Sequence, residues 1–227
     1  MKERLIAVQQ KIQAAAANCG RDPRTIRLVA VSKTQPVQIA REAIFAGVNI
    51  LGENYIQEAR EKFNALYNEP VSWHFIGHLQ TNKAKYAVRI FNLIHSVDSF
   101  KLATELEKQA AKLNKVQEIL IQVNISQEAT KSGVTLENTI TLIRRIAEYK
   151  HIAVMGLMTM PPFFNEPEKV RPYFKALREL GDQIAKEKIP HVSMQELSMG
   201  MTGDFQTAVE EGATLVRIGT AIFGERQ

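Results

Sequence analysis

Short apolar runs alternate with longer amphipathic segments along this chain. The runs are rich in Val, Ile and Leu, and the segments between them carry apolar residues at helical spacing. Buried parallel strands joined by crossover helices produce such an alternation. Eight runs are predicted strands, namely 26–31, 48–52, 73–76, 93–96, 118–124, 154–158, 196–198 and 215–218.

An additional amphipathic helix is predicted before the first strand, at residues 2–19. Leu5, Val8 and Ile12 share one of its faces, and Gly20 ends it. Eight strand–helix units in 227 residues predict a (β/α)8 TIM barrel of the α/β class, with this extra N-terminal helix. An open doubly wound sheet is the alternative. It is less favoured because no Gly-x-Gly-x-x-Gly follows the first strand.

Composition limits the kind of protein further. Apolar residues make up 45% of the chain, which is enough for one sizeable core, and no linker-like stretch interrupts it, so one domain is expected over 1–227. The one cysteine, Cys19, excludes an internal disulfide framework and fits a reducing compartment. We see no signal peptide and no run of about 18 apolar residues, so we expect a cytoplasmic protein without a membrane partner.

Charged residues of both signs are dispersed through the sequence. The formal net charge is +5, without a basic block or an aromatic-rich basic strand, so a nucleic-acid partner is not expected. The mild positive balance suits a small anionic ligand. No cluster of His, Cys and carboxylate residues has the spacing of metal ligands, and we therefore expect no metal.

The first predicted strand leads directly to Lys33, and Pro36 begins the helix that follows. Active sites of parallel barrels form at the C-terminal ends of the strands. An amine beside apolar walls loses solvation there, which favours its neutral form and lets it attack an aldehyde to form a Schiff base. Considered alone, Lys33 is more simply a surface residue at a strand end, so the other strand ends have to decide.

Small polar residues follow the last two predicted strands. Ser198-Met199-Gly200 supplies a hydroxyl and open backbone N–H groups, and Gly219-Thr220 supplies the same after the eighth strand. Barrels often bind phosphate between these two loops, where glycine lets the backbone approach and a helix N-terminus favours negative charge. Either pair alone is typical of an ordinary turn, but both pairs together with Lys33 predict a phosphate site.

Arg217 interrupts the apolar eighth strand. A buried arginine needs a partner, so it either pairs with an acid on a neighbouring strand or donates into the site. Phosphate-binding loops, an amine and a fixed donor suggest pyridoxal 5′-phosphate, with its aldehyde on Lys33 and its ring nitrogen accepting from Arg217. Because arginine stays protonated, it would leave the ring nitrogen unprotonated. This disfavours transaminase-type chemistry and leaves racemase-type chemistry or simple holding of the cofactor.

Longer segments resemble a known family over almost the whole chain. They are Val-Ala-Val-Ser-Lys33-Thr, Gly52-Glu-Asn54-Tyr, His74-Phe-Ile-Gly-His78-Leu-Gln-Thr-Asn-Lys83, Val123-Asn-Ile, Lys131-Ser-Gly133, Gly156-Leu-Met-Thr159, Leu197-Ser-Met-Gly200-Met-Thr-Gly-Asp204 and Val216-Arg-Ile-Gly219. These segments are similar to those of the pyridoxal phosphate homeostasis proteins, once labelled "proline synthase co-transcribed". The resemblance implies a fold-type III barrel like the N-terminal domain of alanine racemase.

The resemblance also implies a set of cofactor-binding residues around a Schiff base to Lys33. Phosphate contacts are implied for the loops after the last two strands, at Ser198, Met199, Gly200, Gly219 and Thr220. It further implies a ring-nitrogen contact for Arg217 and positions near the ring for Asn54 and Met158. His78, Lys83 and Lys131 are candidate accessory residues near the mouth. In the family, either lysine would hold a second cofactor molecule in transit, although solvated lysines and a structural imidazole are the simpler interpretation.

Two functions remain open from the sequence. The first is a non-catalytic monomer that holds pyridoxal 5′-phosphate for vitamin B6 and amino or keto acid homeostasis, and transiently serves apo-enzymes. The alternative is an amino-acid racemase, which needs a second base opposite Lys33. In related racemases that base comes from a second domain. Only nine residues follow the last predicted strand here, so Tyr55 or His78 would have to replace it.

Overall fold

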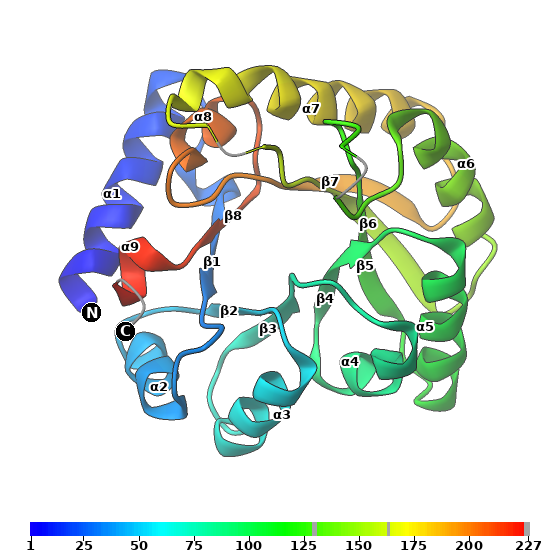
Figure 1. Cartoon of the computed structure of the whole chain (residues 1–227), viewed down its shortest axis with the longest axis horizontal. Coiled ribbons are helices and arrows are strands. Elements are labelled where there is room, and N and C mark those ends of the chain that lie inside the picture. The colour runs from blue at the N-terminus through cyan, green and yellow to red at the C-terminus, as the bar shows by residue number, and fades with distance from the viewer. Residues whose placement is uncertain (129–130, 163, 225–227) are drawn as a thin grey trace.

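A closed barrel of eight parallel strands forms the centre of the molecule (Figure 1). The computed structural model describes residues 1–128, 131–162 and 164–224, so the last three positions of the predicted domain lie outside the described residues. Each strand pairs with its sequence neighbours, and the last strand pairs with the first. The strands are β1 (Arg27–Val31), β2 (Ile50–Glu53), β3 (Ser72–Phe75), β4 (Leu93–Val97), β5 (Gln117–Gln122), β6 (Ile152–Met158), β7 (Val192–Ser198) and β8 (Leu215–Ile218). The predicted (β/α)8 barrel is confirmed, and the open sheet is excluded.

Helices surround this barrel on its outer side. They are α1 (Lys2–Asn18), α2 (Val37–Phe45), α3 (Ile56–Ala65), α4 (Ala84–Ile90), α5 (Phe100–Lys112), α6 (Leu136–Ile146), α7 (Arg171–Lys186), α8 (Phe205–Glu210) and α9 (Thr220–Phe223). The predicted extra helix is confirmed as α1, which lies beside α8 and α9 (Figure 1). In the described parts of the chain, no helix combines the length and the apolar character needed to cross a bilayer.

Most strands differ from the sequence prediction by one or two residues at an end, and three differences bear on the site or on the predicted elements. The helix that follows β3 begins only at Ala84, after a 3-10 turn over Thr81–Lys83. β7 begins at Val192 rather than 196. The prediction missed its first residues because they are not fully buried and their apolar pattern is weak. β5 ends at Gln122, so Asn124 lies in the following loop, where its amide donates to the Glu128 and Lys131 carbonyls.

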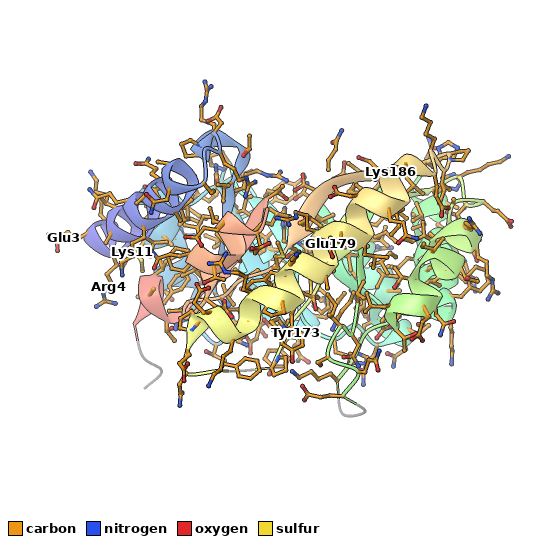
Figure 2. All side chains as sticks on the ribbon, turned by 90° about the horizontal axis from the view of Figure 1, so that it is seen from above. Glu3, Arg4, Lys11, Tyr173, Glu179 and Lys186 are labelled. Carbon is orange, nitrogen blue, oxygen red and sulfur yellow. The ribbon has the colours of Figure 1, made fainter. Side chains whose placement is uncertain are left out.

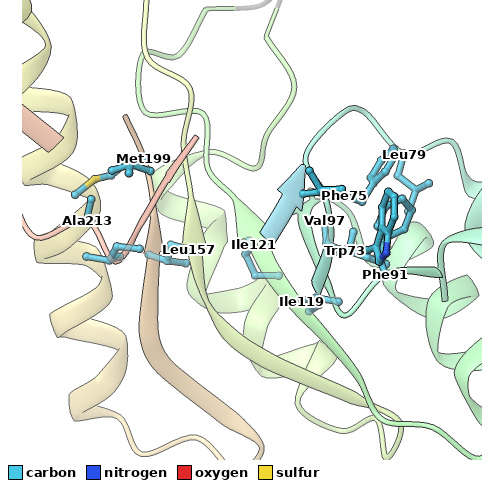
Figure 3. Close-up of a cluster of buried hydrophobic side chains, with 14 of the residues drawn as sticks. Trp73, Phe75, Leu79, Phe91, Val97, Ile119, Ile121, Leu157, Met199 and Ala213 are labelled. Atoms are coloured by element: carbon cyan, nitrogen blue, oxygen red, sulfur yellow. The ribbon is translucent and has the colours of Figure 1, made fainter. Parts of the chain in front are cut away.

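The hydrophobic core has an outer shell and an inner layer. The outer shell lies between strands and helices, and Figure 3 shows part of it, including Trp73 and Phe91. α7 illustrates its packing, because Phe174 and Leu177 are buried while Glu179 and Lys186 point outward in Figure 2. The inner layer fills the barrel with Val29, Ile50, Leu93, Leu120, Met158 and Leu215. The barrel is therefore a packed core, and a ligand can enter only at its ends.

Candidate functional site

A cavity of about 280 Å³ opens at the C-terminal end of the barrel. It combines the ends of β1, β2, β3 and β8 with the loops after β6 and β7. Its lining consists of Val31, Lys33, Asn54, Ile76, Met160, Phe164, Met201, Thr202, Gly203, Asp204, Arg217, Gly219 and Thr220. A larger cavity of about 480 Å³ lies between α1 and the other end of the strands, but it contains no comparable set of chemical groups. The lining residues therefore make the smaller cavity the candidate functional site.

Lys33 lies two residues beyond the end of β1 and is half-buried in the cavity wall. The loop around it is held from both sides. The Ser32 hydroxyl donates to Glu53 Oε1 (2.6 Å), and the Thr34 N–H donates to Glu58 Oε2 (2.8 Å). Thr34 has a left-handed φ of 65°, which needs such support because a β-branched residue adopts it at a cost. The loop therefore delivers the Lys33 amine from a fixed backbone.

A buried ion pair lies behind this loop. Lys62 Nζ is 2.7 Å from Glu53 Oε1 and donates to the Ser32 carbonyl (2.5 Å). Both side chains are almost completely buried. Burial raises the pKa of the Glu53 carboxyl, and the Lys62 charge opposes this increase. Among the residues that the structure describes, Glu53 Oε2 is buried without a hydrogen-bond partner, so the carboxylate depends on its contacts through Oε1.

Arg217 is a buried cation at the cavity floor, only 4% exposed. Its Nη1 donates to Ser198 Oγ (2.6 Å) and its Nη2 to the Thr159 carbonyl (2.9 Å). Within the described residues no salt bridge includes Arg217, so the alternative of a structural ion pair is wrong. Burial lowers the pKa of Arg217 to about 10, and Asp204 partly opposes this shift. Arg217 therefore stays charged at neutral pH, and neutral acceptors leave that charge available to an acceptor in the cavity.

The two loops predicted to bind phosphate meet at the cavity, but their residues lie at different depths. Gly219 and Thr220 line it, and the Thr220 hydroxyl bonds to the Thr202 hydroxyl (3.2 Å). The Ser198 hydroxyl is completely buried and bonds to Arg217 and His95. The first N–H groups of a helix have no intrahelical acceptor, so the start of α9 at Thr220 is suited to an anion.

Gly200 is required by packing. Its φ is +89°, and a Cβ there would lie 2.5 Å from Ala208 Cβ on α8. The loop can approach α8 closely only without a side chain at this position. The neighbouring Met199 side chain is completely buried in the outer shell, beside Ala213 in Figure 3, so only its backbone faces the loop region.

Asn54 and Met158 differ in their access to the cavity. Asn54 lines it, and its Oδ1 is buried without a hydrogen-bond partner in the described parts of the chain. Such an acceptor is suited to a donor from a ligand. Met158 is completely buried in the inner layer of the barrel and does not line the cavity, whereas Met160 does. Because β6 ends at Met158, that side chain lies below the mouth.

The accessory candidates lie around the rim. His78 is exposed and lines two neighbouring hollows, one with Lys83 and the other with Lys131. Lys131 pairs with Glu128 Oε1 (3.2 Å), and Lys83 Nζ lies 6.0 Å from the Tyr86 ring centroid. These positions agree with solvated groups near the mouth rather than with groups inside the cavity.

Several site residues were missed by reasoning from the sequence. The carboxyl of Asp204 lines the cavity, and its Oδ1 accepts from the Met201 N–H (2.6 Å). Burial raises the pKa of Asp204, while this hydrogen bond and the Arg217 charge oppose the shift. The position of Asp204 shortly after the seventh predicted strand could have indicated that it faces the site. Phe164 lies well beyond the end of β6 in the sequence, and no sequence pattern indicated that it lines the cavity. In the described ranges, no three His, Cys, Asp or Glu side chains gather as metal ligands do.

Comparison with known proteins places this geometry in a family. The model of the alanine racemase N-terminal domain matches residues 4–227. A pyridoxal phosphate homeostasis protein of Aquifex aeolicus is 48% identical over 225 residues, covering 99% of this chain and 98% of that protein. The chain belongs to the pyridoxal phosphate homeostasis protein family. Its member from Escherichia coli is 42% identical over 227 residues, covering 98% of this chain and 95% of that protein.

Solved structures agree with this membership. PipY of Synechococcus elongatus, a structure with pyridoxal phosphate bound, has a TM-score of 0.86 and 32% identity and covers 98% of this chain and 99% of its own. A protein of unknown function from Bifidobacterium adolescentis has a TM-score of 0.91 and 33% identity, covering 97% and 93%. An alanine racemase of Clostridium difficile shares only the fold, at 14% identity and a TM-score of 0.74, and this chain covers 57% of it.

Proposed function

We propose that this protein binds pyridoxal 5′-phosphate and serves in vitamin B6 homeostasis, holding the cofactor as a Schiff base on Lys33 without catalysing a reaction. The observation that carries the proposal is the convergence of three groups on one cavity. They are the Lys33 side chain, the Arg217 cation and the buried Asn54 Oδ1, of which the last two have no salt bridge and no hydrogen-bond partner, respectively, among the described residues. An aldehyde matches the Lys33 amine, a pyridine nitrogen can accept from Arg217, and Asn54 Oδ1 can accept from a hydroxyl of the ligand. The cofactor bound by the PipY relative supports the same assignment.

Each residue has a defined task in this proposal. Lys33 binds the aldehyde carbon, and Arg217 donates a hydrogen bond to the ring nitrogen. Gly219 and Thr220 donate to the phosphate at the start of α9. Ser198 supports Arg217 from below, and Gly200 lets its loop close on α8. When bound, the cofactor would supply an electron sink. Arg217 would keep this sink weak, because the guanidinium donates a hydrogen bond to the ring nitrogen without giving up its proton.

The position of potential bases supports a holding function over racemisation. Racemisation needs a base on each face of the cofactor. Tyr55 is 55% exposed and His78 is also exposed, and both line neighbouring hollows rather than the cavity. The racemase alternative stays testable because the Asp204 carboxyl, a potential base, does line the cavity. Loss of α-deuterium from amino acids, abolished by Lys33→Ala, would establish the enzyme and overturn the holding function.

The first test is spectroscopic. We expect purified protein mixed with pyridoxal 5′-phosphate to show visible Schiff-base absorption, and borohydride to fix the label on the peptide that contains Lys33. Lys33→Ala should lose both the absorption and the label, while Lys11→Ala on the outer face of α1 should retain them. A protein that stays colourless and unlabelled with added cofactor would remove the proposal.

The cellular setting is also part of the proposal. We propose a cytoplasmic monomer that transfers the cofactor to apo-enzymes during transient contact. The exposed, unpaired Cys19 supports a reducing compartment, and the position of the cavity at the barrel mouth supports transfer. Light scattering tests the monomer, and recovery of activity by an apo-enzyme, faster from the loaded protein than from an equal concentration of free cofactor, tests transfer.

A further inference from the structure

A line of hydrogen-bonded side chains crosses the barrel interior beneath the cavity. Arg217 on β8 donates to Ser198 Oγ on β7 (2.6 Å), and this oxygen lies 2.8 Å from His95 Nδ1 on β4. His95 Nε2 in turn lies 2.9 Å from His74 Nδ1 on β3. His95 and Ser198 are completely buried, and His74 is 3% exposed. The line joins strands on opposite sides of the barrel and ends at Arg217, whose guanidinium lines the cavity.

The line has a direction that follows from the chemistry of its members. A guanidinium only donates, so Ser198 Oγ accepts from Arg217 and its own proton needs an acceptor. In the described chain, the other hydrogen-bond partner of that hydroxyl is His95 Nδ1. A proton on His95 Nε2 then points at His74 Nδ1, so both neutral imidazoles are the Nε2–H tautomer. Burial agrees with neutral rings, because it lowers the pKa of both histidines.

A competitor for Arg217 lines the same cavity. The Asp204 carboxylate also lines it and interacts electrostatically with Arg217, yet no salt bridge joins the two within the described residues. If the guanidinium turned to Asp204, the pair would be neutral and the donor would be withdrawn from any ligand. Ser198 and the Thr159 carbonyl hold the guanidinium in its present orientation.

We propose that His95, oriented by His74, is a positioning residue for the cavity: by fixing the Ser198 hydroxyl as an acceptor, it keeps Arg217 away from Asp204 and available to the bound ligand. This role rests on the proposed function, because the ligand is the pyridine ring of pyridoxal 5′-phosphate. Neither histidine touches the cavity, so both act only through Ser198 and Arg217.

Two substitutions at one position separate positioning from packing. His95→Asn keeps an oxygen acceptor close to the place of Nδ1, whereas His95→Leu removes the acceptor and fills more of the space. We expect His95→Leu to weaken cofactor binding about tenfold and to alter the visible spectrum, and His95→Asn to stay within about twofold of the unmodified protein. Equal losses in both variants, or no loss in His95→Leu, would overturn the proposal.

Asp204→Asn supplies the matching suppressor. In His95→Leu/Asp204→Asn the competing carboxylate is absent, so Arg217 has no charged alternative. We expect the double variant to bind the cofactor within about threefold of Asp204→Asn alone. A double variant that keeps the full tenfold loss would show that Arg217 is not being captured by Asp204, and would overturn the mechanism.

Nitrogen-15 NMR of the ligand-free protein tests the line of hydrogen bonds without the cofactor. We expect His74 and His95 both to show the Nε2–H tautomer, with the His95 assignment made from His95→Asn. Two Nδ1–H tautomers would reverse the hydrogen bonds and overturn the proposal, even where His95→Leu fails to fold. If the unmodified protein does not bind pyridoxal 5′-phosphate, the proposed function fails, and the tautomers still decide how Ser198 is oriented.

Discussion

Lys62 Nζ lies 2.7 Å from Glu53 Oε1, inside the molecule and directly behind the Lys33 loop. The same ammonium donates to the carbonyl of Ser32, the residue before Lys33. Lys62 on α3 thus connects the loop that carries Lys33 to Glu53 at the end of β2. Removing one partner would leave the other charge buried and unpaired, which is the costly way to break such a pair.

We expect Lys62→Met to lower the free energy of unfolding by about 3–5 kcal/mol, because it isolates the Glu53 carboxylate. Urea denaturation monitored by circular dichroism measures this. Lys62→Met/Glu53→Gln should recover most of the loss, since the amide carries no charge and still accepts from Ser32. A double variant no more stable than Lys62→Met would show that packing, and not charge, dominates at this position.

The buried histidine His74 should make the protein acid-sensitive. Burial lowers its pKa from the usual 6.5 to about 3, so the unfolded chain binds more protons than the folded one between these values. The stability that His74 contributes is complete above about pH 6.5 and is lost as the pH falls towards 3. We expect the free energy of unfolding of His74→Gln to change less over this range than that of the unmodified protein. His78→Gln, at an exposed histidine, is the control and should leave the slope unchanged.

Two glycines of one loop should respond differently to alanine. Gly200→Ala places a methyl group 2.5 Å from Ala208 Cβ at a φ of +89°, and should cost about 1–3 kcal/mol of stability. At Gly203 a Cβ meets nothing within 4 Å, so Gly203→Ala should be close to neutral. Thermal unfolding of the two variants compares them directly. Equal melting temperatures would mean that the loop moves away from α8 without cost.

The charge at position 217 should control the spectrum of the bound cofactor. Arg217→Glu would offer a carboxylate to the ring nitrogen, which favours protonation of the ring and a changed visible absorption. Arg217→Gln keeps a neutral donor and separates the effect of the carboxylate from the loss of the cation. An unchanged spectrum in Arg217→Glu with cofactor still bound would place Arg217 away from the ring nitrogen.

Some of the site could be predicted from the sequence because strand ends are visible in it. Lys33 and Arg217 stand out as charged residues at the ends of apolar runs, and both line the cavity. The family resemblance implied a position near the ring for Met158, yet Met158 lies in the inner layer, and Met160 lines the cavity. The predicted fifth strand included Asn124, but β5 ends at Gln122 and the Asn124 amide holds the following loop. β6 ends at Met158 as predicted, but that side chain still packs inside the barrel, and two residues further along the chain Met160 reaches the cavity.

By itself, the sequence determined the barrel, the extra helix and the strands that carry the amine and the guanidinium. Burial patterns and helical periodicity are local properties, so they can be read along the chain. Only the tertiary structure decided that Ser198 meets His95, 103 positions away, and that Asp204 faces the same cavity as Arg217. The stagger of strands in a closed barrel sets the height of each inward side chain, and that stagger depends on all eight strands packing together.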